Sequence, residues 1–227
     1  MKDIRLVDLF GQYEKISAEI DKAVLDVLRS TAYINGPEVK AFASELEDYL
    51  EVGHVIPCAN GTDALQIALM SLGLRAGDEV VTPSFTYIAT AEVIALLGLK
   101  PVFAEVDPDT FVITADTLEA ALTPATKAVI PVHLYGQCAD MEGILKLARN
   151  RGIAVIEDAA QALGAIYSFA DGSAKKAGTM GDVGCTSFFP SKNLGCYGDG
   201  GAIMTQDEQL AKKIAMVSNH GQQRKYY

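Results

Sequence analysis

Apolar residues recur at helical spacing over the first third of the chain, and the periodicity then changes. The spacing predicts helices over residues 11–31, 38–50 and 62–73. Further along, short apolar runs rich in Val and Ile alternate with helical stretches. The runs that predict strands are Glu79–Thr82, Val102–Val106, Ala128–Val132, Ala154–Glu157, Cys185–Phe189 and Ala202–Thr205. The helical stretches are Thr86–Leu97, Asp116–Leu122, Met141–Asn150 and Glu208–Ser218.

The apolar runs do not alternate with polar residues, which is typical of strands buried on both faces of a sheet. Strands and helices that follow one another in this way predict an α/β fold with a mostly parallel sheet flanked by helices. Ligands of such sheets bind beyond the carboxyl ends of the strands, so polar residues there are candidates for a site. The polar, Gly-rich stretch Ser168–Asp182 predicts a surface loop or hairpin.

Composition and charge narrow the class of protein. The chain has 227 residues, of which 49% are hydrophobic and 21% charged, and these values exclude disorder and low complexity. A formal net charge of −10 disfavours nucleic acid and anionic membranes as partners. We expect no signal peptide and no membrane span. The cysteines and histidines are scattered, so we expect reduced thiols, a cytoplasmic location and no metal site.

Three segments carry residues suited to chemistry. The first, Asn60-Gly61-Thr62-Asp63, follows an apolar strand and opens an apolar helix. The backbone N–H groups of a helix N-terminus bind anions, and the Thr62 hydroxyl adds a donor for a phosphate. The alternative is a plain N-cap made by Asn60, Thr62 or Asp63.

The second segment places Glu157 and Asp158 at the end of an apolar strand. A carboxylate at this position can hold a cationic ring nitrogen, a metal or a ribose. The alternative is again a helix cap, because Asp158 precedes two alanines.

The third segment places Lys192 between an aromatic strand and a glycine-rich turn. A lysine desolvated beside bulky apolar groups becomes an imine-forming nucleophile, whereas an ordinary surface lysine is a solvated charge. An anion cradle, a strand-end carboxylate and an imine-forming lysine, in that order, are the contacts that pyridoxal phosphate needs.

Four segments are specific when taken together: CANGTDAL (58–65), PSFTYIATAE (83–92), VIEDAAQALGA (155–165) and SFFPSKNLGCYGDGGA (187–202). On these segments the chain resembles the DegT/DnrJ/StrS-type family of pyridoxal-phosphate sugar aminotransferases, which have the aspartate-aminotransferase fold (fold type I). The resemblance implies that residues 1–227 form the cofactor-binding large domain, with an N-terminal helical segment over about 1–50. It also implies a homodimer with shared active sites.

The resemblance implies catalytic roles for residues that match the family motifs. Lys192 would form the imine with pyridoxal 5'-phosphate and then move a proton between substrate and cofactor carbons. Asp158 would pair with the pyridine nitrogen and keep it protonated. Gln161 would have a cofactor-binding role, through a hydrogen bond near the 3-hydroxyl of the cofactor.

The same resemblance implies cofactor-binding roles for five further residues. Gly61, Thr62 and Ser187 would hold the phosphate, with Asp63 close by. Tyr87 would stack on the cofactor ring, although on its own it is better explained as a core aromatic residue.

The implied reaction transfers an amino group from an amino-acid donor, glutamate by resemblance, to a keto group of a nucleotide-linked sugar in amino-sugar or surface-polysaccharide biosynthesis. The segments FPSK (189–192) and LYGQCAD (134–140) resemble the members that aminate a UDP-linked 3-keto sugar, the UDP-2-acetamido-2-deoxy-3-oxo-glucuronate transaminases. Tyr33 and Ser191 are candidate sugar-nucleotide contacts, and Tyr33 is equally explained as a packing residue. Arg224 and Lys225 are a candidate local positive charge, or else a solvated loop.

Other functions stay open. One is amination of a 4-keto-6-deoxy sugar nucleotide, or a non-sugar reaction on the same fold. Another is a non-catalytic cofactor-binding module. Members of the family are longer than 227 residues. We therefore expect this chain to be a fragment that lacks the small C-terminal domain. Such a fragment should bind the cofactor weakly and convert substrate slowly.

Overall fold

A computed structural model describes residues 6–223, so Arg224 and Lys225 lie outside the described part. The chain divides into two compact units, residues 1–45 and 46–227. The first unit contains α1 (Leu9–Ser30) and the beginning of α2 (Pro37–Leu50). Asp8 caps α1 by accepting a hydrogen bond of 3.0 Å from the Gly11 N–H, and the helix ends at Thr31 in the left-handed conformation. The two helices predicted for this region are confirmed, to within two residues at each end.

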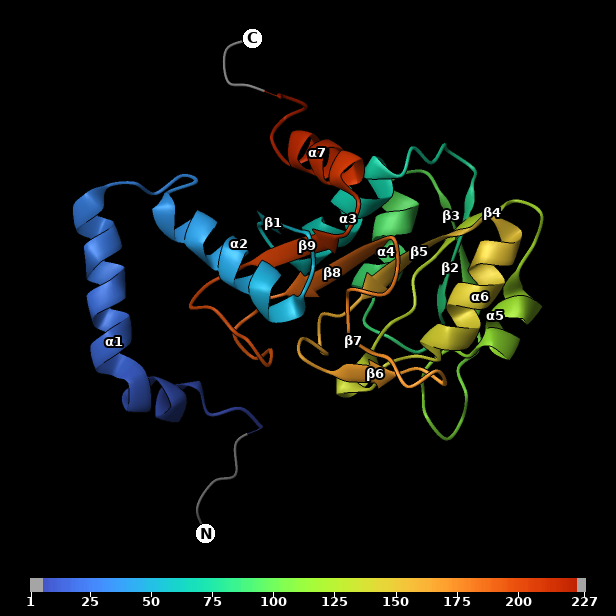
Figure 1. Ribbon diagram of the computed structural model, residues 1–227, viewed down its shortest axis with the longest axis horizontal. Helices are drawn as coiled ribbons and strands as arrows, with labels where there is room; N and C mark the ends of the chain where they lie inside the picture. Colours follow the sequence, from blue (N-terminus) through green and yellow to red (C-terminus); the bar gives the residue numbers. More distant parts are fainter. Residues whose placement is uncertain (1–5, 224–227) are drawn as a thin grey trace. The chain divides into compact units, whose positions relative to one another are not determined.

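The second unit is built on a seven-stranded sheet (Figure 1). Its strands are β1 (His54–Cys58), β2 (Glu79–Pro83), β3 (Lys100–Ala104), β4 (Thr126–Val129), β5 (Ala154–Asp158), β8 (Val183–Ser187) and β9 (Gly201–Thr205). Their order is β1-β9-β8-β5-β4-β2-β3. Strand β9 is antiparallel to both of its neighbours, while the other pairs are parallel, so β1 runs in the same direction as the remaining strands. The mostly parallel sheet is confirmed.

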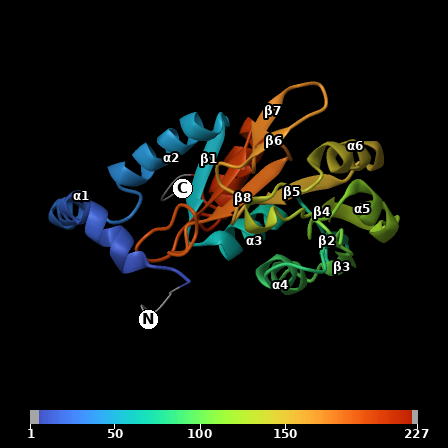
Figure 2. The ribbon, with the colours of Figure 1, turned by 90° about the horizontal axis from the view of Figure 1, so that it is seen from below.

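Helices cover both faces of this sheet (Figure 2). They are α3 (Gly61–Ser71), α4 (Ala89–Leu96), α5 (Ala115–Ala121), α6 (Met141–Arg151) and α7 (Glu208–Val217). Adjacent residues of one strand pack in different hydrophobic cores, because their side chains point to opposite faces of the sheet. Val80 packs with α3, α4 and α7, whereas its neighbour Val81 packs with α5 and α6. This double burial explains why the strands read as unbroken apolar runs.

Three strands begin and end about two residues earlier than their apolar runs predict. Strands β3, β4 and β8 end at Ala104, Val129 and Ser187. The apolar run continues past two of these ends because the loop residues Val132 and Phe188 are also buried. In these places hydrophobicity reports burial of the following loop rather than strand pairing.

The stretch predicted to be a loop or hairpin contains a hairpin. Strands β6 (Ile166–Ser168) and β7 (Ala174–Lys176) pair antiparallel, and a turn over residues 178–181 follows them. Between β4 and α6 the chain forms a short 3₁₀ turn, η1 (Leu134–Gly136). Within residues 6–223, no helix has both the length and the apolar composition needed to cross a membrane.

Candidate active site

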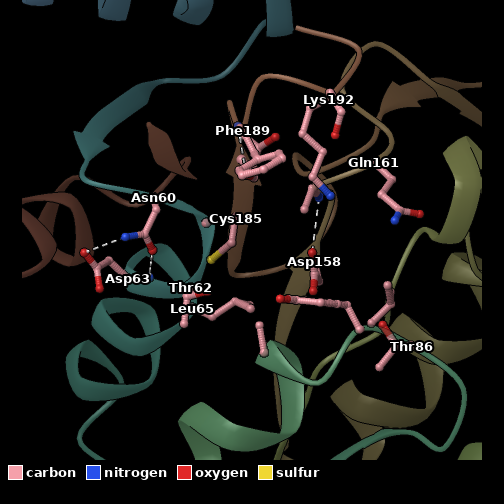
Figure 3. A pocket seen from close by; sticks show the side chains of 18 of the residues that line it. Asn60, Thr62, Asp63, Leu65, Thr86, Asp158, Gln161, Cys185, Phe189 and Lys192 are labelled. Carbon is pink, nitrogen blue, oxygen red and sulfur yellow. Dashed lines mark hydrogen bonds between the residues drawn. The ribbon is translucent and has the colours of Figure 1, made fainter. Parts of the chain in front are cut away.

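A pocket of ≈ 540 Å³ lies where β1, β2, β5 and β8 end (Figure 3). The carboxyl ends of parallel strands are where an α/β sheet binds ligands. The predicted site residues that line this pocket are Gly61, Thr62, Asp63, Tyr87, Asp158, Gln161, Ser187, Ser191 and Lys192. Tyr33 belongs to the first unit, where its hydroxyl donates to the Leu28 carbonyl oxygen at 3.0 Å, and its substrate role stays a prediction.

The N-terminus of α3 forms one wall of the pocket. Asn60 is its N-cap, and its side-chain oxygen accepts a hydrogen bond of 2.8 Å from the Asp63 N–H. The cap and the anion site are therefore compatible, because the cap leaves the Gly61 and Thr62 N–H groups in the first turn without helical acceptors. A Cβ on Gly61 would lie 2.7 Å from the Ser187 Cβ, so only glycine allows the helix to approach β8 this closely.

Asp158 ends β5 and is 7% exposed. Its Oδ1 accepts from the Ala160 N–H at 3.1 Å, and its Oδ2 accepts from the Thr90 hydroxyl at 2.9 Å. Burial raises the pKa of this carboxyl, while the two hydrogen bonds and the positive charge of Lys192 act in the opposite direction. A desolvated carboxylate of this kind suits a cationic partner in the pocket.

The Gln161 side chain is held in one orientation. Its Oε1 accepts a hydrogen bond of 2.7 Å from the Tyr135 N–H. Tyr135 has φ 55° and ψ 22°, a left-handed conformation that directs its N–H toward Gln161. The Gln161 amide group is therefore oriented as a donor toward other partners.

Lys192 lies in the loop that follows β8 and is half-buried. Its N–H donates to the Phe189 carbonyl oxygen at 2.8 Å, which holds the loop in a tight turn. Figure 3 shows its side chain extending toward Asp158. Lysine is also the single cation among the charged lining residues, which include Asp63, Asp158 and Asp199. The described lining of the pocket therefore carries more negative than positive charge.

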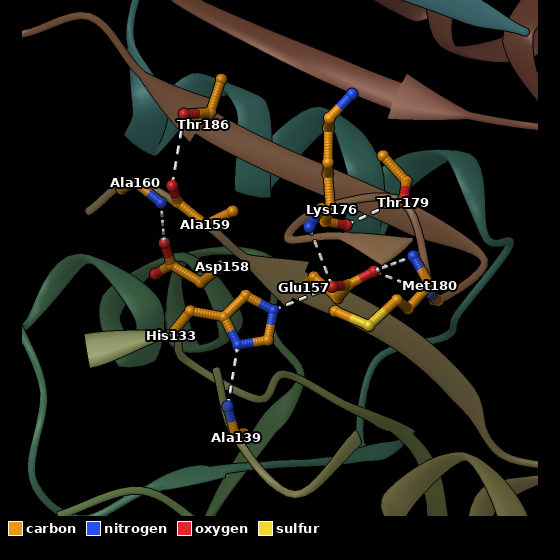
Figure 4. A network of polar contacts seen from close by, with 12 residues as sticks. His133, Ala139, Glu157, Asp158, Ala159, Ala160, Lys176, Thr179, Met180 and Thr186 are labelled. Carbon is orange, nitrogen blue, oxygen red and sulfur yellow. Dashed lines mark hydrogen bonds and ion pairs between the residues drawn. The ribbon is translucent and has the colours of Figure 1, made fainter. Parts of the chain in front are cut away.

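A buried polar network lies behind the pocket (Figure 4). Glu157 is fully buried, and its Oε1 accepts from the Met180 and Gly181 N–H groups at 2.6 Å each. Its Oε2 accepts from the Gly178 N–H at 2.9 Å and lies 2.8 Å from the Nε2 of buried His133. The His133 Nδ1 accepts from the Ala139 N–H at 3.1 Å, which places the ring hydrogen on Nε2 and makes it the donor to Glu157.

This network separates the two strand-end acids. Glu157 and Asp158 are consecutive in β5, so their side chains point to opposite faces of the sheet. Glu157 fixes the turn at 178–181, and Asp158 faces the pocket. In the sequence, only the pair of adjacent acids is visible. The alternation of side chains along the strand then gives Glu157 a structural role and places Asp158 in the pocket.

The four cysteines are free thiols. Burial raises the pKa of Cys58 to about 12 and that of Cys138 to about 11. Cys185 lines the pocket, and burial raises its pKa well above the ordinary value of a thiol. Within the described residues no group of three or more His, Cys, Asp or Glu could hold a metal ion.

Comparison with known proteins assigns the family. The model of the DegT/DnrJ/EryC1/StrS aminotransferase family matches residues 14–227. The chain belongs to this family. It is 53% identical to UDP-2-acetamido-2-deoxy-3-oxo-D-glucuronate aminotransferase of Pseudomonas aeruginosa, over 99% of the chain and 61% of that protein. It is 45% identical to UDP-N-acetyl-3-dehydro-alpha-D-glucosamine 3-aminotransferase of Acidithiobacillus ferrooxidans, over 99% of the chain and 59% of that protein.

Solved structures of the family confirm the aminotransferase fold. A DegT DnrJ EryC1 StrS aminotransferase from Brucella abortus superposes with a TM-score of 0.93 at 43% identity, covering 99% of this chain and 61% of that one. DesV of S. venezuelae, in complex with a ketimine intermediate, superposes with a TM-score of 0.94 at 42% identity, covering 100% of this chain and 60% of that one. The chain thus spans about 60% of the length of these relatives.

Proposed function

We propose that the protein is a pyridoxal 5'-phosphate-dependent aminotransferase acting on a nucleotide-linked keto sugar. The observation that carries the proposal is the convergence of an anion cradle, a desolvated carboxylate and a lysine in one pocket. The alternative, a non-catalytic cofactor-binding module, does not explain why Lys192 lies close enough to Asp158 for their charges to interact. Relatives with aminotransferase names at 53% and 45% identity support the reaction class.

The residues of the pocket fit this cofactor. Gly61 lets the α3 N-terminus lie close against Ser187, so the first-turn N–H groups and the Ser187 hydroxyl line the same side of the pocket and suit a phosphate there. Asp158 offers a buried carboxylate for a protonated ring nitrogen. A structure of the relative NtdA from Bacillus subtilis, 34% identical, holds the cofactor PMP, which supports the same site here. When bound, the cofactor supplies an electrophilic carbon and an electron sink.

Each protein group then has a defined task. The Lys192 Nζ would hold the cofactor covalently and, when free, would carry a proton to or from the substrate carbon as general base and acid. Asp158 would keep the pyridine nitrogen protonated, and the Gln161 amide would donate to the 3-hydroxyl oxygen of the cofactor. Tyr87, which is 72% exposed at the pocket mouth, would stack on the cofactor ring.

We infer a UDP-linked 3-keto sugar as the amino acceptor and glutamate as the donor. The support for the acceptor is that two similar relatives carry names of UDP-3-oxo sugar aminotransferases. Ser191 lines the pocket beside Lys192, where a hydroxyl suits a sugar, and Tyr33 is the second candidate contact. The competing acceptor is a 4-keto-6-deoxy sugar nucleotide, and assays with both kinds of keto sugar separate the two.

We further propose a cytoplasmic homodimer with shared active sites, in which residues 1–227 form the cofactor-binding large domain. The mouth of the pocket supports a partner surface, because Tyr87 and Phe189 there are 72% and 54% exposed. The acidic pocket supports it as well, since a second chain would supply the positive charge that an anionic sugar nucleotide requires.

Absorbance spectroscopy tests the reaction class before the substrate. The purified protein should take up pyridoxal 5'-phosphate with a visible band, and glutamate should convert that band to the aminated form. Lys192→Ala should abolish the covalent band, while Lys146→Ala, an exposed lysine on α6, should leave it intact. Turnover is then measured with 3-keto and 4-keto sugar nucleotides. A protein that binds no cofactor would contradict the proposal, and turnover of a 4-keto sugar alone would contradict the acceptor.

A further inference from the structure

A threonine in the first turn of α4 contacts the carboxylate at the centre of the pocket. Thr90 has no exposed surface, and its neighbours in the helix, Ala91, Val93 and Ile94, are buried apolar residues. A hydroxyl in such surroundings costs free energy unless it forms a hydrogen bond. The Thr90 Oγ1 donates to the Asp158 Oδ2 at 2.9 Å, across 68 positions of sequence.

The two hydrogen bonds on Asp158 differ in what they fix. The bond from the Ala160 N–H is local and forms within the turn that follows β5. The bond from Thr90 comes from a different element and reaches the other oxygen. Together they hold both carboxylate oxygens and so define the rotation of the carboxylate plane about the side-chain axis.

The same contact links Asp158 to the loop that carries Tyr87. The Thr90 N–H donates to the Tyr87 carbonyl oxygen at 3.4 Å, so Thr90 joins the backbone of this loop to the carboxylate. One residue thus contacts both the loop of the proposed ring-stacking residue, through its backbone N–H, and the proposed ring-nitrogen partner, through its side chain. This arrangement suits a flat ring held between them.

Charges around Asp158 set the background for its titration. Lys192 and His133 act on it from the loops after β8 and β4, Glu157 precedes it in β5, and Cys185 faces it from β8. The Thr90 hydroxyl lowers the pKa of Asp158 against the effect of burial. Removing the hydroxyl should therefore raise the pH at which Asp158 ionises.

We propose that Thr90 is a positioning residue for the cofactor, because its hydroxyl orients the Asp158 carboxylate toward the ring nitrogen. The proposal rests on the proposed function, since it takes Asp158 as the partner of that nitrogen. Thr90 itself touches no reacting atom.

Thr90→Val tests the proposal, because valine keeps the shape and removes the hydroxyl. Loss of one hydrogen bond to a charged group should weaken the binding of pyridoxal 5'-phosphate about tenfold or more, measured by absorbance titration. The pH midpoint of the bound cofactor's visible band should also shift. Thr90→Ser, which keeps the hydroxyl, should restore both values.

Thr82→Val is the matched control. Thr82 in β2 is also fully buried, but its hydroxyl has no hydrogen-bond partner within the described part of the chain. This variant should leave cofactor affinity and the pH midpoint unchanged. Thermal unfolding of the cofactor-free variants checks that each one folds.

A double-mutant cycle separates positioning from general packing. In the Asp158→Asn background, Thr90→Val should lose most of its effect on cofactor affinity. An equal effect in both backgrounds, or wild-type affinity for Thr90→Val, would overturn the proposal while Asp158 keeps its role. If Asp158→Asn binds the cofactor as tightly as wild type, the assignment of Asp158 fails and takes the Thr90 proposal with it. If Thr90→Val does not fold, failure of Thr90→Ser to bind with wild-type affinity refutes the proposal.

Discussion

Replacing the buried carboxylate of Glu157 by an amide should strongly destabilise the fold. Each of its oxygens accepts two N–H groups, three from the backbone of residues 178–181 and one from His133. In Glu157→Gln one oxygen becomes an NH2 group, which cannot accept. Two donors then lose their acceptor and face a further donor. The isosteric substitution is therefore expected to be severe.

The magnitude follows from the two lost bonds. A hydrogen bond to a charged group contributes about 1.5–3 kcal/mol, so two of them amount to roughly 3–6 kcal/mol. The variant no longer buries a charge, but the four N–H groups already replace the water that solvated it, so little is regained. Against a typical folding free energy of about 5–15 kcal/mol, the loss is a large fraction of stability.

Urea denaturation of wild type and Glu157→Gln measures this difference, and thermal unfolding should show a fall of roughly 6 to 24 °C. Glu119→Gln is the control, because Glu119 is exposed and pairs with Arg151 at 3.2 Å. An exposed pair contributes about 1 kcal/mol or less. If Glu157→Gln is as stable as Glu119→Gln, the carboxylate does not organise the turn and the reasoning is wrong.

Two other predictions concern the pocket, and a third concerns the Cys58 thiol near it. Burial raises the pKa of Asp158, so ionisation of this carboxyl destabilises the cofactor-free fold. In Asp158→Asn the remaining oxygen can accept from the Ala160 N–H, and the Thr90 hydroxyl, unlike the N–H donors around Glu157, can rotate to accept from the new NH2 group. The substitution should therefore raise the melting temperature at pH 7, and calorimetry should show the gain vanish as the pH falls toward about 4. Gly61→Ala should weaken cofactor binding in titrations and destabilise the fold by about 1–3 kcal/mol, because the added Cβ would clash with Ser187. Gly198→Ala is the control and should have neither effect, because no atom lies within 4 Å of the Cβ that it adds. Burial raises the pKa of Cys58 to about 12, so only about one thiol in ten thousand should be ionised at pH 8. Mass spectrometry should therefore detect alkylation of Cys58 only at higher pH. Rapid modification at pH 8 would contradict this prediction.

The layered fold was predictable because its signals are strong and local. Unbroken apolar runs identified six of the seven strands of the main sheet, all but β1, and helical periodicity identified the helices between them. The boundaries were less accurate. The helix predicted from Thr86 begins at Ala89, because residues 86–88 form the pocket loop instead. Hydrophobicity reports burial, and near the site loops are buried too.

The sequence predicted which residues line the site, but not which residues hold them in position. Motif resemblance found Lys192, Asp158 and Gln161, which the structure brings together in one pocket. It did not find Thr90, whose link to Asp158 spans 68 positions. A polar residue within an apolar helical run was the available signal, but only the fold shows which buried group it contacts.

The single antiparallel strand of the main sheet, among the residues described, has a consequence for the order of folding. Strand β1 pairs with β9, so His54 meets Thr205, which leaves the ribosome about 150 residues later. The α3 N-terminus and Ser187 are held together by the sheet that β9 completes. Contacts of such long sequence separation form late and slowly. The proposed phosphate site is thus among the last parts of this unit to assemble, and a nascent chain that stops before β9 cannot complete it.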